Sequence, residues 1–224
     1  MEDLVPELLL IDKPAGMTSF DVIRVLRRQM NIKKMGHAGT LDPLATGLML
    51  IGVGPGTKKL TQYIKLDKEY EAEILVGERR ATGDMEGEVV EEKSVDETFT
   101  DEQISSILTT LVGTSTLPVS AYSAIKKDGV AMYKRARKAE KTGEIITDLP
   151  MRDMTVYRVD YNGHENENNR CTVKATFKVA SGTYIRSLAE EFGNRLGYPA
   201  TLKSLRRTKV GEFDIKDAQK LKKI

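Results

Sequence analysis

The stretch GHAGTLDPLATG (residues 36–47) sets a single carboxylate, Asp42, among three glycines. Pro43 disfavours helical backbone at the residue before it, so Asp42 is expected in an extended or turn conformation with a projecting side chain. A carboxylate that is ionised at neutral pH can act as a nucleophile or base without activation by histidine. The spacing leaves a second reading open, in which Asp42 only caps an Asp-Pro turn.

His37 lies five residues before Asp42 and has two possible roles. It can serve as a general base, or it can be a hydrogen-bonded structural group or a ligand contact. Gly39 and Gly47 permit backbone conformations and close approaches that a side chain would block. The residues alone therefore predict an accessible carboxylate and leave the role of His37 open.

The composition indicates a folded protein without disulfides or a structural metal. Of 224 residues 40% are apolar, and no run approaches the roughly 20 apolar residues of a membrane helix. Residues 1–10 lack a basic start followed by a cleavage site, so we expect a cytoplasmic protein. Cys171 is the single cysteine, and His37 and His164 are too few and too far apart for a zinc-type cluster.

The net charge of +2 hides an uneven distribution of charge along the chain. Residues 84–102 carry nine acids against Lys93, whereas three other segments are basic. The basic clusters are Arg24, Arg27, Arg28, Lys33 and Lys34; Lys126, Lys127, Lys134, Arg135, Arg137, Lys138 and Lys141; and Lys203, Arg206, Arg207 and Lys209. Such segregation suits a protein with a basic face for a polyanion, although ordinary solvated helix faces would give the same pattern.

Hydrophobic periodicity predicts interspersed strands and helices. Buried strands are expected at 8–11 and 48–51, and alternating strands at 68–76 and 171–179. One helix is expected to begin with Ser19 as its N-cap, and others are expected over 57–64 and around 132–139. A further helix should follow the capping box at 100–103 and end near Gly113, and the last should follow the break at Ser181-Gly182. Without a repeating βα rhythm, the order of elements favours an α+β fold with a mixed sheet.

Two further segments were weighed as binding sites. Residues 52–59 (GVGPGTKK) follow a strand, but Thr57 precedes Lys58 and the glycine spacing is wrong, so a structural turn is favoured over a nucleotide loop. Tyr184 and Arg186 would share one face of an extended backbone, where they could serve a base and a carboxylate together. A core tyrosine beside a surface arginine is the plainer alternative.

Residues 36–47 resemble the signature of the TruB-type tRNA pseudouridine synthases, which isomerise the T-loop uridine conventionally numbered 55. Other segments are similar to further motifs of that family: residues 12–19 (DKPAGMTS), 68–70 (KEY), 122–126 (YSAIK), 181–186 (SGTYIR) and 205–207 (LRR). The resemblance covers nearly the whole chain. It implies the pseudouridine synthase fold, with a largely antiparallel central sheet flanked by helices and loops, as one catalytic domain over residues 1–224.

The resemblance also implies roles for individual residues. Asp42 matches the catalytic aspartate, Arg186 the arginine that pairs with it, and Tyr70 the tyrosine that stacks on the target base and is placed for proton transfer. The residues implied in substrate binding are His37, which fills the gap left by the flipped base, Tyr184 and Leu205 in the uridine pocket, and Asp84, which helps to hold Arg186. Lys13 is added to the substrate-binding set because its place in the Lys-Pro turn predicts a positional role.

The implied reaction explains a solitary carboxylate. The enzyme cleaves the N1 glycosidic bond, rotates the uracil and rejoins it through C5, so the detached base is itself the acceptor and no cofactor or metal is needed. Attack of Asp42 on C1′, its addition to C6 and a glycal route all remain open, and we favour C1′. In this interpretation Gly39 and Gly47 give clearance for the flipped uridine.

The expected partner is the T-arm of tRNA, bound by a monomer. The excursion at about 118–150 would grip the RNA, and the other basic clusters would line its path through phosphate contacts. The residues expected to bind RNA are Lys126, Lys134, Arg135, Arg137, Arg206 and Arg207.

Two departures from the family pattern and two competing functions are noted. The chain ends at Ile224, where relatives commonly continue into a small C-terminal RNA-binding domain of the PUA kind, and Ala81 stands where an acid is expected, which bears on the role of Asp84. A guide-RNA-dependent rRNA pseudouridine synthase of the dyskerin kind is one alternative, although its motif differs at Ala38 and Leu44. A catalytically idle tRNA-folding or binding module is the other.

Overall fold

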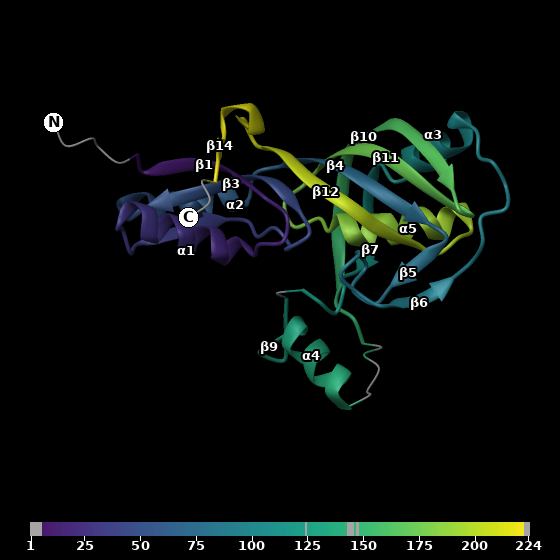
Figure 1. The fold of residues 1–224 in the computed structure, drawn as a ribbon, viewed down its shortest axis with the longest axis horizontal. Coiled ribbons are helices and arrows are strands. Elements are labelled where there is room, and N and C mark those ends of the chain that lie inside the picture. Colours follow the sequence, from purple (N-terminus) through teal and green to yellow (C-terminus); the bar gives the residue numbers. More distant parts are fainter. Residues whose placement is uncertain (1–5, 124, 143–145, 147, 222–224) are drawn as a thin grey trace. The chain divides into compact units, whose positions relative to one another are not determined.

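The computed structural model describes residues 6–123, 125–142, 146 and 148–221, which divide into two units. Unit 1 takes the described parts of Met1–Ala72, Thr176–Gly182 and Ser204–Ile224, and unit 2 takes those of Glu73–Ala175 and Thr183–Lys203. Three strands contribute residues to both units: β4 (Lys68–Val76), β11 (Arg170–Val179) and β12 (Ala200–Val210) (Figure 1). The single catalytic domain expected from the sequence stays a prediction. It can be tested by asking whether the whole chain unfolds in one cooperative transition.

Unit 1 is built around strand β3 (Thr46–Val53), whose residues 48–51 are fully buried. β1 (Leu8–Lys13) and β2 (Met35–Ala38) pair with β3 antiparallel, and β12 pairs with it parallel. The remaining elements are α1 (Ser19–Met30), the 3-10 helix η1 (Gly54–Lys59), α2 (Leu60–Ile64), β13 (Phe213–Asp214), the 3-10 helix η2 (Ile215–Asp217) and β14 (Gln219–Lys220).

The start of α1 differs from the expectation by one residue. Thr18, not Ser19, is the N-cap, and it forms a capping box with Asp21. Ser19 is instead buried and turned towards the loop of Asp42. The expected structural turn at 52–59 is η1, where a side chain on Gly56 would lie 2.0 Å from the carbonyl oxygen of Glu7.

Unit 2 packs two helices against strands. α3 (Asp101–Thr109) begins with the predicted capping box and contacts β10 (Met151–Glu167) and α5 (Ile185–Leu196), with Ile104, Leu108 and Phe192 in the core. The other elements are β5 (Glu78–Arg80), β6 (Val89–Glu92), β7 (Gly113–Pro118), β8 (Lys126–Lys127), β9 (Val130–Ala131) and α4 (Met132–Thr142).

Most predicted elements are confirmed, and the α+β class with a mixed, largely antiparallel sheet is correct. The alternation at 68–76 and 171–179 gives β4 and β11, with inward residues buried as predicted. Gly113 was wrongly placed at the end of a helix, because α3 ends at the C-cap Thr110 and Gly113 starts β7 with a φ of +110°. Within the described residues, no helix has the length and apolar character needed to cross a membrane.

Candidate active site

The loop that carries Asp42 is fixed to unit 1 on both sides of the aspartate. The hydroxyl of Ser19 accepts a hydrogen bond from Leu41 N (2.9 Å) and donates one to Leu41 O (3.0 Å). On the other side, Gly16 N donates to Pro43 O (2.8 Å). Asp42 O accepts from Ala45 N at 3.1 Å, which closes the turn after it. The half-buried Asp42 therefore stands on a constrained backbone and not on a flexible glycine-rich loop.

Lys13 holds the same loop from the end of β1. Its side chain is fully buried, and Nζ donates to Pro14 O (2.9 Å), Met17 O (2.6 Å) and Pro43 O (3.2 Å). A buried ammonium group needs such acceptors to offset its lost hydration. The geometry supports the positional role expected for Lys13.

The glycines of the motif make room for the protein itself. Gly47 has a φ of +105°, and a Cβ there would lie 2.3 Å from the carbonyl oxygen of Arg207, its neighbour in the parallel β3–β12 pair. Gly39 has a φ of +86°, and the nearest atom to a Cβ added there would be Nη1 of the Arg207 guanidinium, at 3.5 Å. The expected clearance for a nucleotide is thus wrong for Gly47, because β12 fills that space.

Arg207 is the largest fully buried side chain of the described chain and is 1% exposed. Its Nε donates to Leu48 O (2.7 Å) and its Nη2 to Gly39 O (3.3 Å). The prediction that Arg207 contacts RNA phosphates is therefore incorrect, since its cation is enclosed and bonded to backbone carbonyls of unit 1.

His37 lies on β2 opposite Ile51 of β3. Burial lowers the pKa of His37 below its ordinary value, and the nearby Arg207 cation lowers it further. The buried Nδ1 has no hydrogen-bond partner among the described residues. The imidazole is therefore neutral at neutral pH, which suits a stacking or contact role better than that of a cation.

Tyr70 and Lys68 occupy the buried face of β4, and Tyr70 is 8% exposed. Lys68 Nζ donates to Ile64 O (2.6 Å), Leu66 O (2.5 Å) and Ser181 Oγ (3.1 Å). Burial, aided by the Arg207 cation, lowers the pKa of Lys68 to about 8. Lys68 is not among the predicted site residues, although its place in the alternation, two residues before Tyr70, puts it on the inward face.

Arg186 and Asp84 come together in unit 2, where both side chains are almost fully buried. Arg186 Nη1 donates to Thr82 O (2.8 Å) and lies 3.5 Å from Asp84 Oδ2, while Nη2 donates to Tyr122 O (3.1 Å). Asp84 Oδ1 accepts from the Thr82 hydroxyl (2.6 Å). The protein thus holds the Arg186 guanidinium from three directions.

Tyr184 and Arg186 do not share an extended face, which corrects that prediction. Tyr184 is the N-cap of α5, and Arg186 already lies in the helix. Leu205 is half-buried in β12, and its carbonyl accepts from the Thr46 hydroxyl at 3.4 Å. Tyr184 therefore belongs to unit 2 with Arg186, while Leu205 belongs to unit 1 with Asp42.

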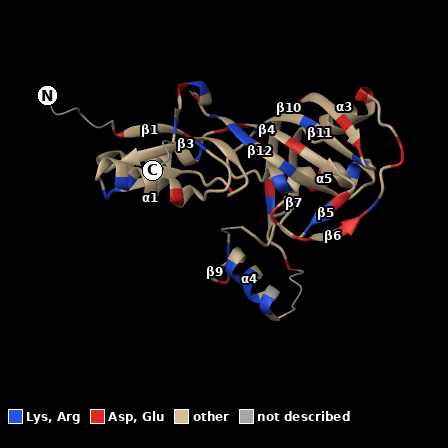
Figure 2. Cartoon of the chain, viewed as in Figure 1, with Lys and Arg blue, Asp and Glu red and all other residues tan. Residues whose placement is uncertain are grey.

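The remaining predicted RNA-binding residues have different surroundings. Lys126, Lys134 and Arg137 are exposed, and Figure 2 shows Lys and Arg along α4. Because α4 buries Met132, Ala136 and Ala139, its exposed cations form a face separate from this buried one. Arg135 instead donates to Lys127 O (2.7 Å) and pairs with Asp128 (2.8 Å). Arg206 makes a two-point ion pair with Asp12 at 3.1 and 2.9 Å. Ala124 and residues 143–145 and 147 of the expected grip lie outside the described residues.

Among the described residues, no group of three or more His, Cys, Asp and Glu side chains is arranged to hold a metal ion. The predicted site residues divide between the two units. Unit 1 holds Lys13, His37, Asp42, Tyr70 and Leu205, and unit 2 holds Asp84, Tyr184 and Arg186.

Comparison with known proteins adds relatives in sequence and in fold. The protein named tRNA pseudouridine synthase B from Corynebacterium efficiens is 42% identical over 211 residues, which cover 94% of this chain and 69% of the relative. Proteins of the same name from Leifsonia xyli subsp. xyli and Acholeplasma laidlawii are 40% and 39% identical, and the match covers 70% of each of them.

Solved structures with a similar fold are more distant in sequence. The structure titled "Structure of H/ACA RNP bound to a substrate RNA containing 2'-deoxyuridine" matches with a TM-score of 0.66 at 23% identity, over 96% of this chain and 50% of that one. The "archaeal box H/ACA sRNP Nop10-Cbf5 complex" matches with a TM-score of 0.64 at 24% identity, over 96% and 51%.

The family comparison covers both the Asp42 loop and the start of α5. Residues 27–185 match the family described as "TruB family pseudouridylate synthase (N terminal domain)". With this match and relatives near 40% identity over more than 90% of the chain, the protein belongs to the TruB family of pseudouridylate synthases.

Proposed function

We propose that this protein isomerises uridine to pseudouridine at position 55 in the T-loop of tRNA, with Asp42 as the nucleophile. The observation that carries the proposal is the fixed loop of Asp42, held by Ser19, Gly16 and Lys13. A nucleophile must be held close to its attack geometry, because small misplacements are costly in rate. The relatives named tRNA pseudouridine synthase B support the choice of tRNA as substrate.

The reaction begins with removal of the target uridine from its stack. Flipping a base costs a few kcal/mol, and stacking on an aromatic side chain returns about 1–3 kcal/mol per base. Tyr70, Tyr184 and Leu205 provide the aromatic and apolar surface of the proposed pocket. The neutral His37 occupies the gap that the uridine leaves in the RNA.

Asp42 then attacks C1′ of the ribose as the C1′–N1 bond breaks, which gives a covalent sugar ester and a free uracil anion. The uracil rotates, C5 bonds to C1′ as the ester breaks, and the C5 proton departs while N1 ends with a proton. Atoms and electrons balance within the substrate, so no cofactor or external acceptor is consumed. We assign the proton transfer from C5 to Tyr70.

Arg186 is proposed to pair with Asp42 and keep it ionised when the pocket excludes water. Thr82, Asp84 and Tyr122 hold the guanidinium group of Arg186. A positioned arginine offers planar, directional donors that a mobile side chain would not. Arg186 is thus assigned to the catalytic set together with Asp42 and Tyr70.

The exposed cations of α4, together with Lys126, are proposed to bind phosphates of the T-arm, and Arg206 contributes from β12. Phosphate contacts position the RNA without selecting its sequence. We further propose that the protein is cytoplasmic and acts as a monomer. The mass of the protein–tRNA complex in solution tests the oligomeric state.

Fold likeness alone does not separate this function from that of a guide-dependent enzyme, since the H/ACA structures share the fold at 23–24% identity. The separating experiment uses a T-arm transcript tritiated at uracil C5, with no guide RNA present. We expect tritium release and one pseudouridine in the T-loop. Release only after a guide RNA is added would favour the guide-dependent function, and tight binding without release would favour a non-catalytic module.

A further inference from the structure

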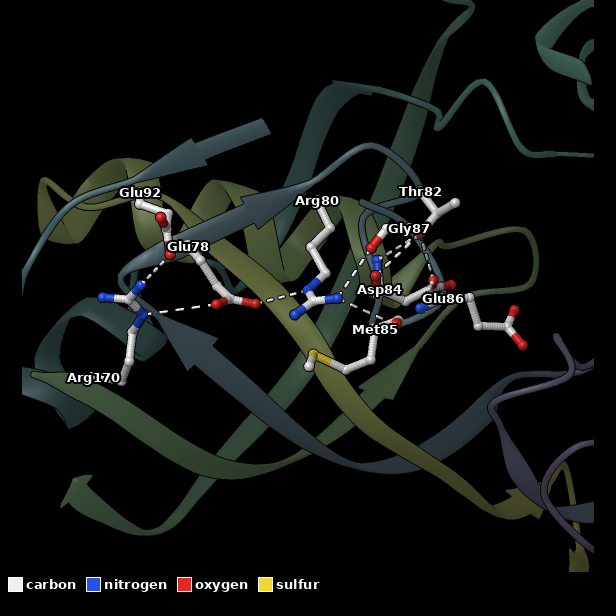
Figure 3. A network of polar contacts seen from close by, with 9 residues as sticks. All are labelled: Glu78, Arg80, Thr82, Asp84, Met85, Glu86, Gly87, Glu92 and Arg170. Atoms are coloured by element: carbon white, nitrogen blue, oxygen red, sulfur yellow. Dashed lines mark hydrogen bonds and ion pairs between the residues drawn. The ribbon is translucent and has the colours of Figure 1, made fainter. Parts of the chain in front are cut away.

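The turn between β5 and β6 is closed by backbone and side-chain hydrogen bonds (Figure 3). Ala81 N donates to Glu88 O (2.9 Å), and Gly83 N donates to Arg80 O (2.9 Å). Inside the turn, Asp84 Oδ1 accepts from the Thr82 hydroxyl (2.6 Å) and from Glu86 N (3.1 Å). These bonds fix the direction in which Thr82 O and Asp84 Oδ2 point.

Those two oxygen atoms are the groups that bind the Arg186 guanidinium, at 2.8 and 3.5 Å. Thr82 O also accepts from the Ser120 hydroxyl (3.1 Å). The turn therefore supplies two of the contacts that orient Arg186. Any change in its shape would move both oxygen atoms together.

Arg80 ties the two arms of this turn together. Its Nη1 donates to Gly87 O (3.0 Å) and lies 3.5 Å from Met85 O, on the far side of the turn. Its Nε donates to Glu78 Oε1 (2.7 Å), and the two side chains are 22% and 10% exposed. The pairing register between β5 and β6 shifts between Arg79 and Arg80.

The carboxylate of Glu78 is itself anchored. Its Oε2 lies 3.7 Å from Arg170 Nε, and Arg170 Nη2 contacts Glu92 at 2.7 Å. Figure 3 shows the resulting chain of contacts, from Glu92 through Arg170, Glu78 and Arg80 to the Asp84 turn. Partly buried, multi-point charge networks hold a geometry better than isolated surface pairs do.

We propose that Arg80 is a positioning residue for catalysis: clamped to Glu78, it holds the 82–87 turn in the shape in which Thr82 and Asp84 orient Arg186. This inference rests on the proposed function only in that the step affected by Arg80 is pseudouridine formation. The Arg80 side chain bonds to Glu78, Met85 and Gly87, so we expect its loss to lower the rate of the chemical step more than the affinity for tRNA.

The test compares Arg80→Leu, Arg80→Lys and Glu78→Gln with wild type in single-turnover pseudouridine formation, tRNA affinity and thermal unfolding. Arg79→Leu is the matched control, because Arg79 lies beside Arg80 but pairs with Glu91 on an exposed face. We expect Arg80→Leu to lower the single-turnover rate constant about tenfold or more. Its tRNA affinity should change less than threefold, Arg80→Lys should recover part of the rate, and Arg79→Leu should match wild type.

A double-mutant cycle with Asp84→Asn separates positioning from general stability. If Arg80 acts through the turn, removing it after Asp84 has been changed should cost much less than in wild type. Equal losses in both backgrounds, or a wild-type rate in the Arg80→Leu protein, would overturn the proposal. An inactive wild-type protein would instead reject the proposed function, and the two failures are thus distinguishable.

Discussion

At the scale of single residues, Lys13 and Ser19 explain how the chain fixes Asp42. Both side chains are buried, and both bond to backbone atoms of the residues that flank the aspartate. Neither needs to touch the substrate to matter for the rate. The loop shape depends on bonds made by residues that precede it by more than twenty positions.

Replacing Lys13 tests this arrangement. Lys13→Met keeps the length of the side chain but removes its hydrogen bonds to Pro14 O, Met17 O and Pro43 O, of which Pro43 O keeps its bond from Gly16 N. A buried acceptor that is left unpaired costs about 1–3 kcal/mol. We expect a lower melting temperature and a reduced rate of pseudouridine formation. Lys59→Met, which removes a surface ion pair with Glu7, should leave both unchanged. Equal melting temperatures for the two variants would contradict the proposed role of Lys13.

His37 predicts a pH effect on stability. The pKa of His37 in the folded state lies below the ordinary 6.5. Below about pH 6.5 the imidazole is therefore protonated more readily in the unfolded state than in the folded state. The free energy of unfolding should therefore fall as the pH drops through this window. In His37→Gln this contribution to the pH dependence of the free energy of unfolding should disappear, as measured by denaturant titrations at pH 7.5 and 5.5. An unchanged slope would show that His37 titrates normally.

Arg206 and Arg207 show what sequence reasoning could and could not give at this scale. The sequence predicts both as RNA-binding cations, yet Arg207 is enclosed, whereas Arg206 pairs with Asp12 and stays partly exposed. The space for Arg207 exists only because β12 lies beside the glycines of the Asp42 motif. That pairing joins residues about 160 positions apart, which local patterns do not encode.

At the scale of elements, local signals predicted what depends on neighbours in sequence. The alternation in β4 and the capping box of α3 are each complete within about ten residues, and both predictions are confirmed. The parallel β3–β12 pair and the Glu78–Arg80–Arg170 contacts have no such signal, because each needs segments brought together by the fold.

The β3–β12 pair makes Gly47 the most sensitive glycine of the motif. A methyl group in Gly47→Ala would overlap the Arg207 backbone and force β12 away from β3. Gly16→Ala is the control, because Gly16 also has positive φ but open space around it. We expect about 1–2 kcal/mol of destabilisation for Gly16→Ala and a clearly larger loss for Gly47→Ala. Chemical denaturation of both variants measures the loss of unfolding free energy. Similar losses for Gly47→Ala and Gly16→Ala would contradict the close β3–β12 pairing at Gly47.

The outward face of α4 predicts a salt-dependent RNA contact. Lys134→Ala with Arg137→Ala removes two exposed cations and leaves the buried side of the helix intact. The slope of log affinity for tRNA against log salt should fall by about 2. Lys58→Ala with Lys59→Ala removes two exposed cations from η1 and should leave the slope unchanged. Identical slopes for both double variants would exclude α4 as a phosphate contact.

At the scale of the whole molecule, the predicted site residues divide between the two units. Asp42 and Tyr70 come from unit 1, while Arg186 and Asp84 come from unit 2. The family resemblance implies this set, and the structure adds the hydrogen bonds that hold the Asp42 loop, Arg186 and Asp84. What the sequence alone left undecided was whether Asp42 is a turn cap or a reactive group.

The central claim is that Asp42 is the nucleophile of a tRNA pseudouridine synthase. The most direct measurement is pseudouridine formation in a tRNA transcript by wild type and by Asp42→Asn, with tRNA affinity measured on the same preparations. We expect one pseudouridine at position 55 with wild type and none with Asp42→Asn, while the two proteins bind tRNA with similar affinities. Pseudouridine formation at the wild-type rate by a correctly folded Asp42→Asn protein would contradict it.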